Sequence, residues 1–399
     1  MSTIVYSLLL FVAFATLLAL FILLARRWLV PDRPIAIRLN SDRQITGHFG
    51  QKLLQALNEC DIHLPSACAG AGTCGLCHVH LTHTAPPPTP IDKALLNPDQ
   101  IRSGERLACQ LSLRTDIEIT LADEVLSTSS WQARVVCNRS LSPLIHEIEL
   151  AADTQPFQFE SGDFMQLTAP AGTTLLKDVD PGDTHRAAWQ SLNISQLGVR
   201  SEHPQTRAYS LANRPEDTQS VILMIRLALP PAPGVAPGVV SSYLCTRRPG
   251  DRVELSGPHR GFRIVDESRE LVFVGGGVGM APLRSMIHRQ TARQHALPMN
   301  FYYGARTQAD LLYREEFDSL SAAENGFSWT PALSEPDPSW SGEQGFIHTV
   351  LRKQFLDAHP VPASCDYYLC GPPLMIRAVV DELHAAGVQD THIYKDEFG

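Results

Sequence analysis

The sequence contains no Lys- or Arg-rich run and no internal repeat, and its 399 residues carry a formal net charge of −9. Proteins that bind nucleic acid usually present a basic surface to the phosphates, so this charge balance argues against nucleic acid as a partner. Charged residues make up 19% and hydrophobic residues 44% of the chain, an ordinary globular composition. At roughly 150 residues per domain, the chain has room for two or three domains.

One segment, Ile4–Leu24, lacks charge altogether. Its length is close to the ~20 apolar residues that cross a bilayer core as a helix. No basic residue precedes the segment, as one would in a secretory signal, and Arg26, Arg27 and Arg33 follow it. Because basic residues flank the cytoplasmic end of a membrane helix, we predict a single-pass anchor over residues 1–28 with its N-terminus outside. The remaining domains are then cytoplasmic.

Disulfides are not expected in that compartment, and four of the nine cysteines are closely organised. Cys68, Cys74, Cys77 and Cys109 follow the spacing C-x5-C-x2-C-x31-C. A [2Fe–2S] cluster needs four thiolates, and the small residues between the first three cysteines let the backbone wrap closely around it. Zinc sites more often use two separated C-x2-C pairs. The alternatives, zinc or four buried thiols without metal, are therefore less favoured.

The other five cysteines are expected to be small buried side chains, with only Cys370 in a context that suggests more. Alternation predicts a hairpin from Ile35–Asn40 and Gln44–Phe49, followed by a helix within Gln51–Cys60. This region, residues 33–124, forms a compact unit that holds the cluster cysteines.

Short β-rich segments separated by Gly, Pro and Asp over residues 125–265 predict an antiparallel barrel. Within it, residues 171–205 are polar with poor periodicity, which indicates a long loop or insertion. From residue 266 to 399, strands such as Leu271–Val274 and Asn300–Tyr303 alternate with helical runs such as Ala281–Gln294. That alternation predicts a parallel α/β domain.

Three motifs in these two regions suit phosphate-bearing cofactors. Arg207-Ala208-Tyr209-Ser210 offers an arginine for a pyrophosphate and a tyrosine for a flat ring. Gly238–Ser242 can open a short helix towards phosphate, and Gly275–Pro282 follows a strand and opens another helix. The last is not the G-x-G-x-x-G fingerprint, because Met280 occupies its third glycine position. Alone, it could be a tight turn under a helix.

With Tyr303–Arg306 and Cys370–Met375, these motifs resemble, in their order, those of the ferredoxin–NADP reductase superfamily. With the anchor and the cluster unit placed before them, the whole chain resembles the F subunits of the Na+-translocating NADH:quinone reductases. One departure is Gly257–Phe262, where His259-Arg260 replaces a smaller turn.

The resemblance implies a β-grasp [2Fe–2S] domain, an antiparallel β-barrel FAD domain and a parallel α/β NAD-binding domain behind a transmembrane helix. It implies FAD, a [2Fe–2S] cluster and NADH as cofactors, with other membrane subunits and, through them, quinone as partners in a bacterial inner membrane. Hydride would pass from NADH to FAD, and single electrons would pass to the cluster. The alternatives are a reductase that feeds an oxygenase and a binding or redox-sensing module without catalysis.

The resemblance also assigns roles to residues. Arg207 would meet the FAD pyrophosphate, Tyr209 the flavin and Ser210 its N5. Gly238, Ser241 and Ser242 would line the phosphate and ribityl chain of FAD. Gly276, Gly277 and Gly279 would hold the nicotinamide dinucleotide. Cys370 would lie near the nicotinamide, and Phe398 would cover the isoalloxazine face.

Glu335 predicts which nucleotide is used. NADP-specific members of the superfamily tend to place Ser and a basic residue at this point to hold the 2′-phosphate. Glu335 would instead accept hydrogen bonds from the ribose hydroxyls and repel that phosphate, which predicts NADH as the donor. The alternative is that Glu335 points to solvent and leaves Arg306 free to accept either nucleotide.

Overall fold

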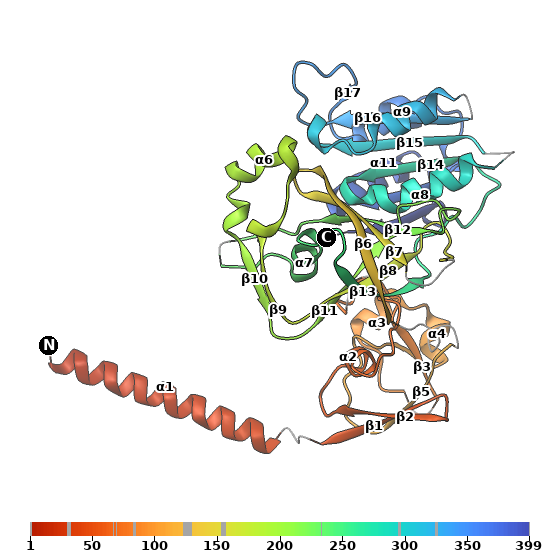
Figure 1. The fold of residues 1–399 in the computed structure, drawn as a ribbon. Helices are drawn as coiled ribbons and strands as arrows, with labels where there is room; N and C mark the ends of the chain where they lie inside the picture. The colour runs from red at the N-terminus through yellow and green to blue at the C-terminus, as the bar shows by residue number, and fades with distance from the viewer. Residues whose placement is uncertain are drawn as a thin grey trace. The chain divides into compact units, whose positions relative to one another are not determined.

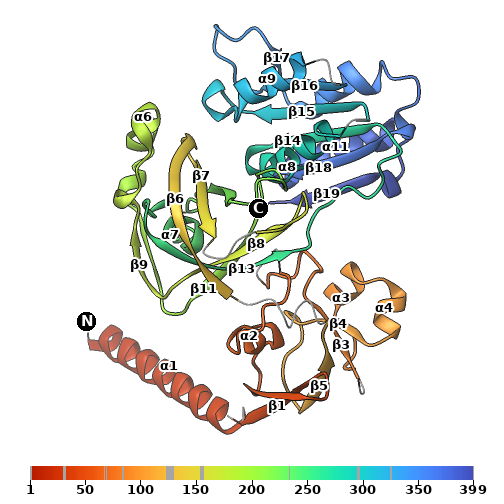
Figure 2. The ribbon, with the colours of Figure 1, turned by 45° about the vertical axis from the view of Figure 1, so that its right-hand side comes forward.

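The computed structural model describes residues 2–29, 33–66, 68, 70–82, 85–122, 130–152, 157–232, 234–293, 297–323 and 326–398. The chain divides into two compact units, Met1–Ser129 and Ser130–Gly399 (Figures 1 and 2). The predicted limit at residue 124 lies outside the described residues. The predicted domain bounds therefore stay predictions.

The first element is helix α1 (Ser2–Leu29), which contains the uncharged segment. Several of its large apolar side chains are exposed, among them Leu10 and Phe11. In the part of the chain that the structure describes, no helix is both long enough and apolar enough to cross a membrane.

The rest of the first unit is built on a five-stranded mixed sheet in the order β2-β1-β5-β3-β4. The strands are β1 (Pro34–Leu39), β2 (Arg43–His48), β3 (His78–Leu81), β4 (Glu105–Leu107) and β5 (Ile117–Thr120). The predicted hairpin is confirmed, since β1 and β2 pair antiparallel, while β1 and β5 pair parallel.

Helix α2 (Leu53–Asn58) buries Leu53, Leu54 and Leu57 in the core of this unit, as their spacing predicts. It is shorter than the run Gln51–Cys60 suggests. Two further helices, α3 (Pro90–Leu95) and α4 (Pro98–Arg102), each begin with a capping box, at Thr89 and Asn97. The mixed sheet with one helix packed on it is the arrangement expected of the cluster domain.

The second unit begins with an antiparallel sheet in the order β11-β8-β13-β6-β7-β12. A bridge between Leu211 and Leu223 joins its two ends, so the sheet closes as the predicted barrel. Inward-facing Val135, Leu167 and Leu255 belong to its buried core. The elements are β6 (Ser130–Ser142), β7 (Ile145–Ala152), β8 (Phe164–Ala169), β11 (Gln205–Ser210), β12 (Ser220–Arg226), α7 (Val239–Cys245) and β13 (Arg252–His259).

The interpretation of residues 171–205 as a long loop is wrong. They form a two-stranded ribbon, β9 (Gly172–Leu175) with β10 (Gly198–Ser201), around helix α6 (Gly182–Ser191) (Figure 1). Short 3₁₀ turns at Leu176–Asp178 and Ile194–Gln196 connect these elements. Trp189 of α6 is buried and donates from Nε1 to the carbonyl of Pro143 at 2.6 Å, which ties the insertion to the barrel.

The remainder of the second unit is a parallel sheet in the order β17-β16-β15-β14-β18-β19, which confirms the predicted α/β domain. Its strands are β14 (Leu271–Gly276), β15 (Met299–Ala305), β16 (Phe327–Leu333), β17 (Glu343–Gln344), β18 (Asp366–Gly371) and β19 (Ile393–Glu397). Every residue of β14 and β18 is buried, as expected for a parallel sheet covered on both faces.

Helices cover the two faces of this sheet (Figure 2). On one face, α8 (Met280–Thr291) and α9 (Arg314–Ala322) contribute Leu283 and Phe317 to a core with Phe273. On the other face, α10 (Ile347–Leu351) and α11 (Pro373–Ala385) contribute Val350 and Val379. Ligands of such sheets bind outside the carboxyl ends of the strands, where β14 ends in Gly275-Gly276 and β18 in Cys370-Gly371.

Candidate functional site

The four predicted cluster cysteines come together as two close pairs. The Sγ atoms of Cys68 and Cys74 are 3.3 Å apart, and the Cys77 side chain hydrogen-bonds to that of Cys109. Within each pair the shared hydrogen bond lowers the pKa of one thiol, Cys68 or Cys109, and raises the pKa of the other, Cys74 or Cys77. A [2Fe–2S] cluster needs four thiolates, two per iron, and these two close pairs of cysteines fit that donor set.

Cys109 is held at the site by backbone contacts from three directions. The N–H of Ala108 donates to the carbonyl of Cys77 at 2.8 Å, and the Ala108 carbonyl accepts from Leu54 at the start of α2 at 3.1 Å. Buried Asp92 accepts the N–H of Leu107 at 2.9 Å. A cysteine far from the others in sequence is thereby fixed beside them.

The glycines of the loop are needed for its shape. Gly72 has φ +81°, and a Cβ there would lie 2.6 Å from Nε2 of Gln110. That same Nε2 donates to Sγ of Cys109 at 3.4 Å. A side chain at residue 72 would therefore push away a group that contacts a predicted ligand.

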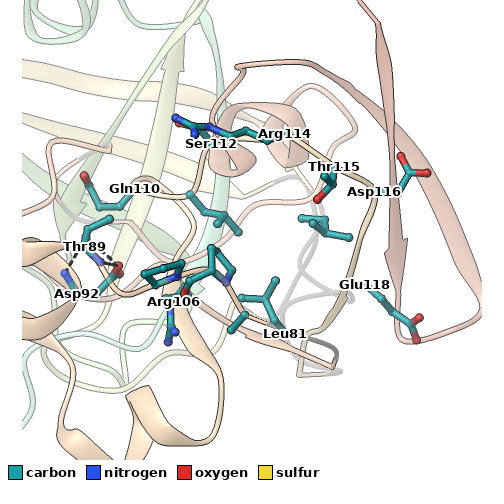
Figure 3. Close-up of a pocket in the computed structure, with 15 residues that line it drawn as sticks. Leu81, Thr89, Asp92, Arg106, Gln110, Ser112, Arg114, Thr115, Asp116 and Glu118 are labelled. Carbon is teal, nitrogen blue, oxygen red and sulfur yellow. Dashed lines mark hydrogen bonds between the residues drawn. The ribbon is translucent and has the colours of Figure 1, made fainter.

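The first unit also contains a cavity of about 520 Å³ (Figure 3). Pro86, Pro87, Arg106 and Arg114 are among the residues that line it. Of the residues named at the cluster site, Asp92 and Gln110 contribute to the lining and the four cysteines do not. The cavity is thus separate from the predicted ligands.

In the second unit, strand β11 carries the predicted flavin residues. Arg207 is exposed and Ser210 is buried, while Tyr209 packs partly against the barrel core. Burial raises the pKa of Tyr209, so its hydroxyl stays protonated at neutral pH. The Arg207 guanidinium donates to the neighbouring Thr206 carbonyl at 2.8 Å, and its exposed position leaves it accessible to a ligand.

The turn into α7 is closely packed. A Cβ on Gly238 would lie 2.8 Å from both Ala228 Cβ and Ser241 Oγ, so a larger residue does not fit. Ser241 Oγ is occupied, since it donates to the Gly238 carbonyl and accepts from the N–H of Ala228. Ser242 Oγ is fully buried and has no hydrogen-bond partner in the described part of the chain. Because protein atoms already cover this hydroxyl completely, it is not open to a ligand.

The glycine loop after β14 approaches β18 closely. A Cβ on Gly279 would lie 2.0 Å from the carbonyl oxygen of Cys370, and one on Gly276 would lie 2.8 Å from the sulfur of Met375. Gly277 has φ +57°. The backbone of β18 therefore excludes a side chain at Gly279, and the positive φ of Gly277 favours glycine. Gly276, Gly277 and Met375 line a cavity of about 460 Å³.

Cys370 and Phe398 lie at the same sheet edge. Cys370 is completely buried, which raises the pKa of its thiol, so it is not an ionised nucleophile. The N–H of Phe398 donates to the carbonyl of Gly371 at 3.1 Å. Asp396 is the strand neighbour of Cys370, and burial raises its pKa to about 6.

Glu335 lies just beyond β16, next to the cavity residue Ser334. Its carboxylate is 3.7 Å from Nε of Arg306, and both side chains are largely exposed. The N–H of Glu335 also donates to the carbonyl of Arg306 at 2.8 Å. Glu335 and Arg306, the two residues considered for recognition of the nucleotide, therefore form an ion pair with each other.

Sequence reasoning missed Phe346 and His348, which line the cavity beside the glycine loop. Their rings stack at 5.9 Å, and Phe346 is 66% exposed. A large exposed aromatic side chain in a ligand cavity suits a flat ring. The signal available in the sequence was Gly345, directly before Phe346. In the structure Gly345 has φ +111°.

A second group of metal-type ligands, Glu270, His359 and Cys365, lies at the amino ends of β14 and β18. Nδ1 of His359 accepts the N–H of Val361 at 3.2 Å. The ring proton therefore sits on Nε2, 3.2 Å from a Glu270 oxygen. The group is satisfied by hydrogen bonds as it stands.

Comparisons with known proteins agree with these two sites. Residues 37–114 match the model of the 2Fe-2S iron-sulfur cluster binding domain, and residues 273–381 match that of the oxidoreductase NAD-binding domain. Among solved structures, the Amycolatopsis cytochrome P450 reductase GcoB superposes with a TM-score of 0.61 at 25% identity, covering 91% of this chain and 98% of its own. The ferredoxin reductase in carbazole 1,9a-dioxygenase superposes with a TM-score of 0.58 at 24% identity, covering 92% of this chain and 99% of its own.

Sequence relatives extend over the full length. The F subunit of the Na(+)-translocating NADH-quinone reductase from Neisseria gonorrhoeae is 37% identical, with 99% of each chain covered. The corresponding F subunit from Yersinia enterocolitica is also 37% identical, with the same coverage. With both the cluster site and the nucleotide site in place, the chain belongs to the family of F subunits of the Na(+)-translocating NADH-quinone reductases.

Proposed function

We propose that this chain is the subunit through which electrons from NADH enter a membrane NADH:quinone reductase. The residues after Ser130 would bind FAD and NADH, and the four cysteines of the first unit would bind a [2Fe–2S] cluster. When bound, FAD takes up hydride as an electron pair and releases the electrons one at a time, as a [2Fe–2S] cluster requires. Other subunits would then pass them to quinone.

The observation that carries this proposal is the pairing of the cluster thiols in a chain that also has an open dinucleotide cradle. The Sγ atoms of Cys68 and Cys74 lie 3.3 Å apart, and at Gly279 the cradle passes so close to the Cys370 backbone that no side chain fits. The chain's own residues would bind and orient the reactants. Buried Cys370 stays a neutral thiol beside the nicotinamide, and Ser210 lies at the end of the strand that carries Arg207 and Tyr209.

The alternative of a reductase for an oxygenase finds some support in the solved structures named above, at 25% identity or less. The full-length relatives at 37% identity favour the quinone reductase. Steady-state NADH oxidation by the purified protein, with ferricyanide as acceptor, tests the enzymatic part of the proposal. Failure to oxidise NADH with FAD bound would leave only the non-catalytic module.

We propose that the nucleotide is NADH, because the carboxylate of Glu335 neutralises Arg306 and would repel a 2′-phosphate. One like-charge contact at ~4 Å is worth roughly 1–4 kcal/mol, and the exposure of both side chains favours the lower end. The wild type should therefore show a kcat/KM about fivefold higher for NADH than for NADPH, and Glu335→Arg should reduce that preference. Equal use of both nucleotides by the wild type would contradict the claim. An unchanged preference in the variant would assign it to other residues.

We propose that residues 1–28 anchor the chain in the inner membrane, with the catalytic domains in the cytoplasm. The uncharged run in α1 and the arginines after it support this. A chain that begins at Pro34 should be soluble and hold both cofactors, because β1 starts there. It should lose quinone reduction that depends on the partner subunits. Na+-dependent quinone reduction by the truncated chain alone would contradict the entry-subunit role.

A further inference from the structure

Helix α8 makes polar contacts with the barrel that no role assigned above uses. Ser285, which is completely buried, donates from Oγ to the carbonyl of Asn213 at 2.7 Å. Arg284 donates from Nη1 to the carbonyl of Ala212 at 2.6 Å. Both contacts join the α/β domain to the barrel within the second unit.

These contacts join α8 to a segment that directly follows the predicted flavin strand. Ala212 and Asn213 follow β11, which ends at Ser210, the residue predicted to lie near the flavin N5. Helix α8 begins at Met280, directly after Gly277–Gly279 of the nucleotide cradle. One helix therefore connects the two peptides that are proposed to hold the hydride donor and the hydride acceptor.

Both sides of this connection are held rigidly. Arg284 forms two hydrogen bonds with Glu316, at 2.7 and 2.9 Å, and His288 contacts the same carboxylate at 2.7 Å. On the barrel side, Asn213 is fully buried and accepts the N–H of Ile222 at 3.1 Å. Neither end can shift without breaking further bonds.

A tyrosine adds a third contact between the two domains. Tyr313 precedes α9, and its hydroxyl donates to the carboxylate of Glu147 on β7. The guanidinium of Arg284 lies 4.7 Å from the centre of its ring. The backbone φ of Tyr313 is +52°, which is unfavourable for a bulky residue. Such a conformation is kept only where the surrounding structure holds it.

We infer that Arg284, Ser285 and Tyr313, the domain clamp, are positioning residues that set the distance between nicotinamide and flavin. This inference rests on the proposed hydride transfer from NADH to FAD. Hydride passes only when the reacting atoms are about 3–3.5 Å apart, and a displacement of about 1 Å can slow such a step ~100-fold. None of the three clamp residues is among those assigned to FAD or NADH, so their loss should slow the transfer step without weakening the binding of either cofactor.

The test uses the full chain with both cofactors and the variants Ser285→Ala, Tyr313→Phe and their combination. Tyr367→Phe is the matched control, because its hydroxyl donates to the Pro362 carbonyl at 2.9 Å within the α/β domain. In anaerobic single-turnover experiments, flavin reduction by NADH should slow about tenfold in each single variant and about 100-fold in the double variant. The FAD content and the NADH Kd should change less than about twofold, and Tyr367→Phe should reduce flavin like the wild type.

Amide hydrogen exchange of the protein without NADH supplies a readout besides activity. Exchange at residues 211–213 and 314–317 should quicken in the clamp variants and not in Tyr367→Phe. Flavin reduction at the wild-type rate in the double variant, or an equal slowing in Tyr367→Phe, would overturn the inference. If the wild type with FAD is not reduced by NADH, the proposed function fails. Unchanged exchange at these residues would still overturn the clamp by itself.

Discussion

Replacing Cys109 by alanine should abolish the EPR signal of the reduced [2Fe–2S] cluster while FAD stays bound. Cys109 is the proposed fourth ligand, distant in sequence and fixed beside Cys77 by the contact between Ala108 and the Cys77 carbonyl. Three thiolates cannot complete a cluster that needs two per iron. NADH oxidation with ferricyanide should survive, because this acceptor can take electrons from the flavin.

Cys60→Ala provides the matched control for this variant. Cys60 is also in the first unit, half-buried at the end of α2, and belongs to neither thiol pair. It should keep a cluster signal of wild-type intensity. A cluster signal of normal intensity in Cys109→Ala would contradict the ligand assignment, as would loss of the signal in Cys60→Ala with Cys109 intact.

Arg207→Ala should release FAD during purification. Arg207 is exposed on β11, where its guanidinium can reach a ligand pyrophosphate with two hydrogen bonds. Losing this charged contact costs about 2–3 kcal/mol, or roughly a 30- to 150-fold higher Kd for FAD. Arg207→Lys keeps the charge but not the paired hydrogen-bond geometry, so its Kd for FAD should lie between those of the wild type and Arg207→Ala.

Arg226→Ala controls for the loss of an exposed arginine from the same barrel. Arg226 is the last residue of β12, and its removal should leave FAD retention unchanged. FAD content is measured by absorption after gel filtration, and the Kd by titration of the apoprotein. Full retention of FAD by Arg207→Ala at the wild-type Kd would remove this residue from the pyrophosphate site.

The sequence predicted the elements whose buried residues form a recognisable pattern within one short segment. Strand β14 is a run of apolar residues that ends in glycines, and a parallel strand buried on both faces requires that pattern. Helix α2 was predicted from Leu53, Leu54 and Leu57, although it is shorter than its apolar spacing suggested. The 2Fe-2S domain was predicted because three of its proposed ligands lie in one loop.

The sequence did not predict features that depend on contacts between distant residues. Helix α6 buries only His185 and Trp189, so it has no periodic apolar face to detect. The bond from Ser285 to Asn213 joins residues 72 positions apart, and neither residue belongs to a motif. Phe346 was overlooked because its position at the cavity depends on how Gly345 turns the chain after β17.

The central claim is that one chain takes electrons from NADH into a flavin and passes them to its own cluster. Anaerobic addition of NADH to the purified protein, followed by visible absorption and low-temperature EPR, tests this directly. We predict bleaching of the flavin band together with the appearance of a reduced [2Fe–2S] signal. A cluster that dithionite reduces but NADH does not, with FAD bound, would contradict the account.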